Sequence, residues 1–515
     1  MKKSGLLGSI SFVMIIMIAS RLLALVSSSV YMSYFGADNV ELNIYSYAIT
    51  IPNTIFTCLG TALSTVVIPI YASHIAQNNR LGAKKFADNI ITLSVLLTAV
   101  LVVAGIALST VIPYLTDYTS ETEYPFAVKS LMIMMPVMFF YGLNFIFQGM
   151  LQSEGKFGWP AFVSVPSSLV VIIYVFTLAD RFGVTGLLVA TFIGLAMQAL
   201  ILVPPLYKTG YRYKPSLKFK DPDIVTAAKM TPPVLIGVSA YQINMFYNTS
   251  MIARYDMVSL LTYVQNIVVY MVLAFVNSVT AVLYPKLTQS VSLGDYDGYK
   301  KTLSDVLANV WTLLIPVTFG LIAVRRELVS LILEWGKTGA DSADAAASLM
   351  FMYALGVIGI GSKEILDRAF YALKNTLIPA VNGFVIMAVN IVLSLVLMKF
   401  LGAYGIPLAY SFASVTGLVI LLIALKKKIG SYGTGLGKTV VKCIISGAVM
   451  LVFVEIVKIP LGNVINGSSF LSRILLLGIP AAFGVLVYGI MIVLLKVPAA
   501  EFVKNALGKV VRKKA

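Results

Sequence analysis

The hydrophobic positions of this 515-residue chain gather into long runs that are separated by short polar breaks. A membrane-spanning helix needs roughly 20 mostly apolar residues, and we distinguish fourteen such runs. They centre near Ala19, Cys58, Val103, Phe139, Val171, Ile193, Ser239, Ala274, Leu314, Ile358, Asn390, Val415, Met450 and Val485. The runs have the length of helices and do not alternate as transmembrane β-strands do. The pattern predicts an all-α polytopic membrane protein with 14 transmembrane helices.

Charge gives the orientation of these spans. The chain is 59% hydrophobic and only 12% charged, with a net charge of +17. Basic residues gather at the start, in the connections after even-numbered spans, and at the end: Lys2, Lys3, Arg80, Lys84, Lys85, Lys208, Arg212, Lys214, Lys218, Lys220, Lys300, Lys301, Lys426, Lys427, Lys428, Arg512, Lys513 and Lys514. Arg325 and Arg326 are the exception. The positive-inside rule places both termini in the cytoplasm, which explains the net charge without a nucleic-acid partner.

Residues that bind metals or cofactors are scarce. Cys58 and Cys443 both fall within predicted spans, where we interpret them as small apolar residues. His74 is the only histidine and has no acidic or thiol cluster nearby, so a transition-metal site is not expected. GTGLGKT at residues 433–439 resembles a phosphate loop but is one residue short between its first and third glycines, so we interpret it as a flexible cytoplasmic linker. The sequence predicts no metal, no cofactor and no enzyme.

The chain contains an internal repeat. TVVIPIYASHIAQNNRLGAKK pairs with AVLYPKLTQSVSLGDYDGYKK at a constant offset of 216, which matches Val66 with Val282, Pro69 with Pro285, Gly82 with Gly298, and Lys84 and Lys85 with Lys300 and Lys301. An offset of 219 matches Pro160 with Pro379, Ala161 with Ala380, Gly183 with Gly402, Gly186 with Gly405, and Ala190 with Ala409. The two collinear sets indicate that spans 1–6 and 7–12 are a duplicated six-helix unit. Since six is even, the repeat is parallel.

The duplication predicts the domain organisation. We expect an N-lobe at residues 1–208, a basic cytoplasmic linker at 209–222, and a C-lobe at 223–428. Residues 429–515 would hold a cytoplasmic linker, two further spans and a basic tail. Two similar bundles that enclose a midplane cavity are typical of alternating-access transport. The thirteenth and fourteenth spans could form a hydrophobic groove for a lipid tail, which is a hypothesis.

One charge lies deep within the first span. In IASRLLALVSSSVYMSYFGA, residues 18–37, Arg21 is the only charged side chain. A charged side chain at mid-membrane costs about 2.5–3.5 kcal/mol even on the insertion scale. We therefore expect Arg21 to face a cavity; burial against helix-end carbonyls is the alternative.

Several motifs occur in a family-specific order. TPPVLIGVSAYQINMFYNT at 231–249, LEWGKTG at 333–339, YALGVIGIG at 353–361 and RAFYALKNTLIP at 368–379 resemble segments of the MurJ (MviN) lipid II flippases. FGA at 35–37 and IPN at 51–53 also match that family. It belongs to the superfamily of multidrug and oligosaccharidyl-lipid exporters, and its members have fourteen spans.

The resemblance implies a function. It implies that the protein flips an undecaprenyl-pyrophosphate-linked cell-wall precursor from the inner to the outer leaflet of the bacterial cytoplasmic membrane. Membrane lipids, and cell-wall synthesis enzymes, are the partners it suggests. The family binds the headgroup in a cationic cavity, and Arg21 matches the first arginine of its first-span pattern.

The remaining cavity positions depart from that pattern. Ser27 and Ser28 stand where the family has a second arginine and an acid, and Gln265 and Asn266 where it has an acid-arginine pair. Asn53 keeps the IPN motif. We take these five residues and Arg21 as the candidate substrate-binding set. Hydroxyl and amide groups can bind phosphate oxygens and sugar hydroxyls, but without charge attraction.

The tenth span carries four charges. Lys363 precedes Asp367 by four residues and Glu364 precedes Arg368 by four, so each pair lies on one helix face. We expect either a self-neutralised helix end or a cytoplasmic gate or coupling site. We find no carboxylate in spans 7, 11 or 12, unlike the sodium site of some family members. Membrane potential, or protonation of Glu364 or Asp367, would then drive the cycle.

Three functional classes stay open. The first is a flippase for lipid II or for another lipid-linked oligosaccharide. The second is an exporter of small amphipathic molecules, which should offer an acidic or aromatic cavity and no lone arginine. The third is a transport-inactive scaffold for cell-wall enzymes.

Overall fold

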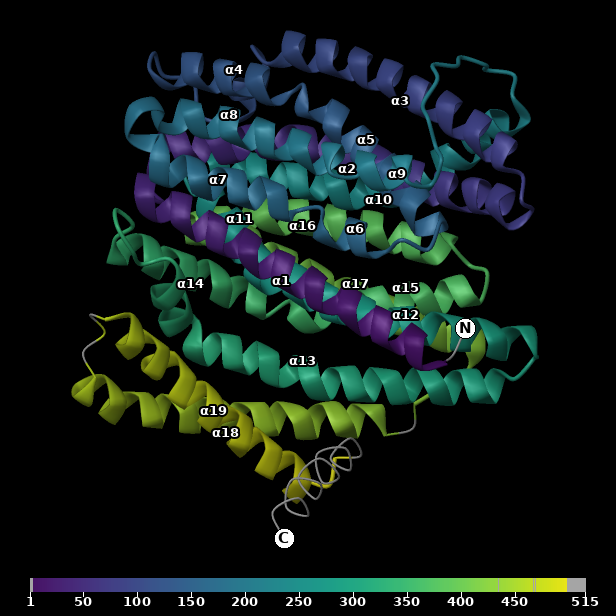
Figure 1. Cartoon of the computed structure of the whole chain (residues 1–515). Coiled ribbons are helices and arrows are strands. Elements are labelled where there is room, and N and C mark those ends of the chain that lie inside the picture. Colours follow the sequence, from purple (N-terminus) through teal and green to yellow (C-terminus); the bar gives the residue numbers. More distant parts are fainter. Residues whose placement is uncertain (1–2, 434, 466, 468, 498–515) are drawn as a thin grey trace. The chain divides into compact units, whose positions relative to one another are not determined.

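The computed structural model describes residues 3–433, 435–465, 467 and 469–497. All regular elements within these ranges are helices, which confirms the all-α expectation (Figure 1). The basic residues expected at the two ends, Lys2, Arg512, Lys513 and Lys514, lie outside the described residues.

The first half of the chain forms ten α-helices and one short 3-10 helix. In order these are α1 (Lys3–Phe35), α2 (Val40–Ala76), α3 (Arg80–Leu108), η1 (Ile112–Leu115), α4 (Glu123–Met134), α5 (Val137–Ser153), α6 (Gly158–Phe162), α7 (Val165–Thr177), α8 (Ala179–Leu200), α9 (Val203–Tyr207) and α10 (Pro222–Ala253).

The second half continues with helices of similar length. They are α11 (Val258–Gln265), the π-helical turn η2 (Asn266–Tyr270), α12 (Met271–Ser292), α13 (Tyr296–Ile332), α14 (Ala340–Ala354), α15 (Val357–Ala372), α16 (Leu377–Leu401), η3 (Gly402–Tyr404), α17 (Gly405–Ile429), α18 (Leu436–Val464) and α19 (Phe470–Leu494).

Each of the fourteen predicted centres lies within one of these helices. Within the described residues, nine helices are long and apolar enough to cross a membrane. Up to eleven qualify when two bent pairs are counted as single spans. One pair bends by 43° inside α10 and the other by 44° between α14 and α15. The membrane character is confirmed, and the count of fourteen stays a prediction.

The chain divides into two compact units. The first extends to Ser259 and includes Gly336–Thr338, and the second contains Leu260–Trp335 and the residues from Gly339 onward. Helix α10 therefore packs within the first unit, whereas the repeat assigned it to a C-lobe that starts at residue 223. The lobes expected from the duplication differ from the packing units by this helix, by the short segment that follows it up to Ser259, and by Gly336–Thr338.

Polar contacts along α2 explain why α10 packs there. Near one end, Asn43 Oδ1 accepts hydrogen bonds from the backbone N–H and the hydroxyl of Ser259, which lies at the start of α11 just beyond α10, at 3.0 and 2.9 Å. Further along, the hydroxyls of Tyr47 and Ser250 are 3.3 Å apart. At the other end, His74 contacts Asp223 at 2.8 Å. The partners run in opposite directions along the chain, so α2 and α10 are antiparallel over most of their length.

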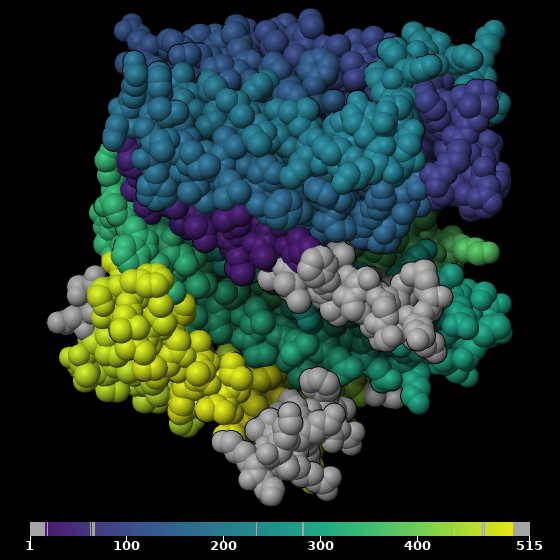
Figure 2. All heavy atoms as spheres, in the orientation of Figure 1, coloured from purple at the N-terminus to yellow at the C-terminus, as the bar shows by residue number. Residues whose placement is uncertain are grey.

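In the second unit, α13 is the central support. It packs against α14, α15, α18 and α19, and Figure 2 shows α18 and α19 in yellow along its surface. Near one end of α13, Arg326 pairs with Glu334 at 2.6 Å and with Asp344 at 2.5 Å. Burial alone would raise the pKa of Glu334, but hydrogen bonds from Arg326 and Ser330 and the charges of Arg326 and Arg473 together outweigh burial, so the pKa is lowered. This pairing accounts for the exception of Arg326 to the charge pattern.

Local geometry recurs at positions that the repeat pairs. Asn79 caps α3 by accepting from Gly82 N–H, and Asp295 caps α13 by accepting from Gly298 N–H, at 2.9 and 2.8 Å. Gly183 and Gly402 share an unusual backbone conformation, with φ 55° and ψ −149° in one and φ 55° and ψ −134° in the other. This recurrence supports the duplication.

The interpretation of residues 433–439 as a flexible linker is wrong for its second half. Gly435 takes a left-handed conformation with φ 99° and caps α18, which begins at Leu436. Thr434 lies outside the described residues. The glycine ends the loop because it adopts this φ without the steric cost of a side chain, and the apolar run that follows continues as a helix.

We predict that Gly183→Ala destabilises the protein by about 1–3 kcal/mol, because this backbone conformation is essentially restricted to glycine. The space around a Cβ at this position is open, so the effect would come from the backbone alone. Thermal unfolding in detergent measures it. Gly237→Ala, in a helix with open space, is the control; equal melting temperatures for the two variants would contradict the prediction.

Candidate functional site

Arg21 lies on α1 next to the contact that holds this helix in the first unit. The buried Ser20 hydroxyl donates to the carbonyl of Ala161 at 3.1 Å, and α1 packs against α6 and α7. Arg21 is exposed on the protein surface. Among the described residues, its guanidinium has no ion pair or hydrogen bond. The side chain is therefore not buried against helix-end carbonyls and is available to an anionic ligand.

The two serines of the candidate set lie further along α1. Ser27 is buried, and the Ser28 hydroxyl donates to the carbonyl of Ala24 at 3.1 Å within the same helix. Asn53 is exposed on α2 and accepts from the Thr57 hydroxyl at 3.0 Å. Within the described residues, no hydrogen bond joins Asn53 to these α1 positions. The first-unit members of the set are thus distributed over two helices and are not joined by hydrogen bonds among the described residues.

Gln265 and Asn266 lie in the second unit where α11 changes into the π-helical turn η2. Gln265 is buried and donates to the Tyr353 hydroxyl at 2.8 Å, and the Tyr353 ring packs edge-on against Tyr410. Asn266 donates to the carbonyl of Thr262 at 2.9 Å. Gln265 therefore supports the packing around Tyr353. The π-helical turn itself is a feature that often occurs at functional sites.

The four charges of α15 form the two pairs that their spacing predicts. Lys363 contacts Asp367 at 2.5 Å, and Arg368 contacts Glu364 at 3.1 Å. The Asp367 side chain is nearly buried, and its second oxygen, Oδ1, has no hydrogen-bond partner among the described residues. A buried carboxylate oxygen without a partner costs free energy. Asp367 is therefore a better candidate for protonation than the more exposed Glu364.

The second unit also contains an apolar cavity of about 610 Å³. Residues from α13, α17 and α18 line it, among them Trp311, Ile315, Leu418, Leu422 and Val440, with Lys426 and Tyr432 at the loop side. Helix α18, one of the two helices expected to form the lipid-tail groove, lines this cavity together with residues of α13 and α17. The groove stays a hypothesis.

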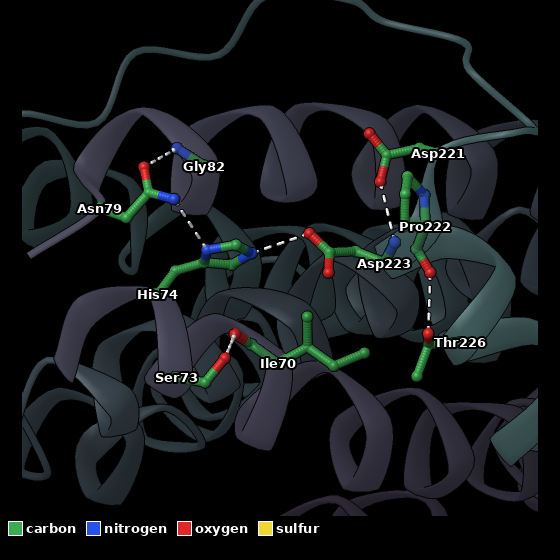
Figure 3. Close-up of polar contacts among 9 residues, drawn as sticks. All are labelled: Ile70, Ser73, His74, Asn79, Gly82, Asp221, Pro222, Asp223 and Thr226. Atoms are coloured by element: carbon green, nitrogen blue, oxygen red, sulfur yellow. Dashed lines mark hydrogen bonds and ion pairs between the residues drawn. The ribbon is translucent and has the colours of Figure 1, made fainter. Parts of the chain in front are cut away.

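A polar network joins three helices of the first unit (Figure 3). His74, in the last turn of α2, contacts Asp223 in the first turn of α10. On its other side, the His74 ring nitrogen Nδ1 is 3.3 Å from the Asn79 amide, which caps α3. A buried hydrophobic cluster from α2, α3, α5, α9 and α10 lies in the same part of the unit.

The hydrogen bonds assign the proton on His74. Asn79 Oδ1 accepts from Gly82 N–H, so the Asn79 amide nitrogen faces His74 and donates to Nδ1. The proton of the neutral ring then sits on Nε2, which donates to Asp223. From the sequence, we consider His74 only as a possible metal ligand and do not predict its contact with Asp223. The cap motif N-x-x-G that follows it, and the D-P-D start of α10, are the signals that point to this network.

A family model described as "Lipid II flippase MurJ" matches residues 31–470. The chain belongs to the lipid II flippase MurJ family. A probable lipid II flippase MurJ of Vibrio cholerae is 24% identical over 414 residues, which cover 77% of this chain and 78% of the relative. The lipid II flippase MurJ of Burkholderia cenocepacia is 24% identical over 402 residues, covering 76% and 78%. The suspected family is confirmed.

Solved structures support the same fold. Lipid II flippase MurJ in an inward closed conformation gives a TM-score of 0.78 at 23% identity, covering 96% of this chain and 99% of that one. An inward-facing multidrug resistance MATE family transporter gives 0.68 at 12% identity, covering 83% and 99%. The MurJ family model begins at residue 31, so Arg21, Ser27 and Ser28 precede the matched segment.

We predict that Asp223→Asn lowers the free energy of unfolding by at most half as much as Asp223→Ala does. The asparagine amide oxygen can still accept a hydrogen bond from His74 Nε2, whereas alanine cannot. The loss in the alanine variant should be about 1 kcal/mol, the typical value of one hydrogen bond. Thermal unfolding in detergent compares the two, with Asp221→Asn as a control for charge at the same helix start. Equal losses for asparagine and alanine would indicate a charged histidine instead.

Proposed function

We propose that this protein carries a lipid-linked cell-wall precursor, with lipid II as the first cargo to test, from the inner to the outer leaflet by alternating access. The observation that carries the proposal is the family match over residues 31–470, with relatives named lipid II flippase. The protein would move its cargo without covalent chemistry. The protein would act in the bacterial cytoplasmic membrane with both termini in the cytoplasm.

Arg21 is the proposed anchor for the pyrophosphate. Its guanidinium is exposed and unpaired within the described residues, and arginine recognises phosphate with two parallel hydrogen bonds. Ser27, Ser28 and Asn53 of the first unit, and Gln265 and Asn266 of the second, are the candidates for neutral hydrogen bonds to the headgroup; Gln265 also donates to Tyr353. A site with one fixed charge fits a cargo whose sugars and peptide provide further polar groups.

Coupling would use α15. Protonation of Asp367 would remove the charge from its buried carboxylate and weaken its attraction for Lys363, so the pair offers two arrangements of different charge. The membrane potential and a sodium gradient are the other energy sources for the transport cycle that should be tested. Contact with cell-wall synthesis enzymes remains a prediction from the family resemblance.

The direct test is complementation. The endogenous lipid II flippase is depleted in a bacterial host, this chain is expressed, and the lipid II accessible to an external probe is measured. Restored accessibility supports lipid II as cargo. If accessibility is not restored while the protein is present in the membrane, the cargo is another lipid-linked glycan or the protein does not transport.

We predict that Arg21→Ala lowers the rate of accessible lipid II formation by about tenfold or more, since a hydrogen bond to a charged group contributes about 1.5–3 kcal/mol. Arg21→Lys should retain part of the activity because the charge remains. Leu22→Ala, at the neighbouring exposed position, is the control. Normal transport in Arg21→Ala, at normal membrane abundance, would remove Arg21 from the site.

For Asp367, we predict that Asp367→Asn abolishes transport and that the double variant Lys363→Gln with Asp367→Asn stays inactive. A coupling role requires a titratable group, whereas a merely structural ion pair can be replaced by a neutral pair. The same assay measures both, with Glu364→Gln and Arg368→Gln together as the matched control pair. Recovery of transport in the Lys363–Asp367 double variant would show that the pair only neutralises a helix end.

The second candidate function is export of small amphipathic molecules, which the likeness to the MATE transporter favours. Arg21 opposes it, because an exposed cation repels cationic cargo. Drug resistance conferred on a sensitive host, together with failed complementation, would favour this candidate.

A further inference from the structure

The loop between α9 and α10 has a fixed backbone although residues 211–218 have no regular secondary structure. Three side chains of α3 hold it. Asn89 accepts from the Lys218 N–H and donates to the Lys218 carbonyl, both at 2.9 Å. Asp88 accepts from the Lys214 N–H at 3.1 Å, and Thr92 from the Ser216 N–H at 3.2 Å. Figure 1 shows the loop arching beside the start of α3.

The first tyrosines of this loop strengthen the attachment. The buried Tyr211 hydroxyl donates to Asp88 at 2.8 Å, and its ring belongs to the hydrophobic cluster of the first unit. The hydroxyls of Tyr213 and Thr92 are 2.8 Å apart. Asp88 and Asn89 are themselves buried. The loop therefore presents its remaining side chains in a defined arrangement.

Those side chains are basic and apolar in alternation. Residues 208–220 contain Lys208, Arg212, Lys214, Lys218 and Lys220 and no acid. All five are exposed, and none forms an ion pair within the part of the chain that the structure describes. Between them, Leu217 is 48% exposed and Phe219 64% exposed. Exposed apolar side chains that alternate with unpaired cations are typical of a surface that binds an anionic membrane.

The attachment places the loop at the height of the membrane boundary. Ser216 contacts Thr92, and Val95, Leu96 and Leu97 follow on α3 with exposed side chains. Val95 is three residues further along, about 4.5 Å in the direction of the helix axis. Leu217 therefore lies where the lipid-facing part of α3 begins.

We propose that residues 208–220 form a binding surface for the anionic phospholipid headgroups of the cytoplasmic leaflet. Arg212, Lys214, Lys218 and Lys220 contact phosphate groups, while Leu217 and Phe219 insert between the headgroups. The surface is separate from the cargo site and does not require Arg21. Its partner is a phospholipid such as phosphatidylglycerol, and not the pyrophosphate of the cargo.

Native mass spectrometry of the full chain tests this surface by measuring how much added phosphatidylglycerol or phosphatidylcholine the protein retains. Replacement of Lys214, Lys218 and Lys220 by Gln should weaken phosphatidylglycerol binding by about fivefold or more per residue at low salt and leave phosphatidylcholine unchanged. The matched control replaces Lys426, Lys427 and Lys428, in the last turn of α17, by Gln. Phe219→Ser should weaken binding without changing its salt dependence.

Three results would overturn the proposal. The loop variant could bind phosphatidylglycerol as the wild type does, or the α17 control could lose as much, which would indicate net charge alone. Alternatively, undecaprenyl pyrophosphate could compete for the loop more strongly than phosphatidylglycerol, which would assign the surface to the cargo. Melting temperatures should match among variants, because Asp88, Asn89 and Thr92 are retained. The lipid II complementation assay tests the proposed transport function independently of phospholipid binding. Failure of the loop proposal would therefore not contradict the transport proposal, or the reverse.

Discussion

Polar contacts join α2 to α10 and to the start of α11, and the arrangement of the first unit depends on them. Hydroxyl, amide and imidazole groups in or beside hydrocarbon are costly unless each has a partner. Asn43 with Ser259, Tyr47 with Ser250, and His74 with Asp223 satisfy this demand only in one antiparallel register. That register brings α10 into the first unit and places the start of α10 beside the cap of α3, to which the basic loop is attached.

The two copies of the repeat share the same helix-cap geometry, but only the first copy has the contact between histidine and aspartate. Asn79 and Asp295 cap their helices in the same way, and the N–H of each bonds to the carbonyl of the residue five positions earlier, His74 or Ser290. The first copy thus has an imidazole where the second has a hydroxyl. Among the described residues, the Ser290 side chain forms no hydrogen bond to a neighbouring helix, so the same backbone turn supports an interhelix contact in the first copy only.

Charge is used in two distinct ways. Lys363 on α15 and Arg326 on α13 each contact a carboxylate within 2.6 Å, which neutralises them inside the helical framework. Arg21 has no such partner among the described residues, and neither does the basic loop. A paired cation stabilises the fold, whereas an unpaired one can attract a phosphate. In the two proposals, Arg21 would contact an anionic group of the cargo, whereas the basic loop would contact anionic groups of the membrane.

Sequence alone determined the features that depend on near neighbours. Helix positions follow from apolar run length, the α15 pairs from a four-residue spacing, and the caps from N-x-x-G and D-x-x-G. Only the tertiary structure decided that Gln265 supports Tyr353, that His74 meets Asp223, and that Asn89 holds the loop at Lys218. These partners are 88, 149 and 129 residues apart. Many polar side chains could form a hydrogen bond with Gln265, His74 or Asn89, and their spacing along the chain does not show which one does. The packing of the helices decides the partner, because it brings only certain side chains close enough.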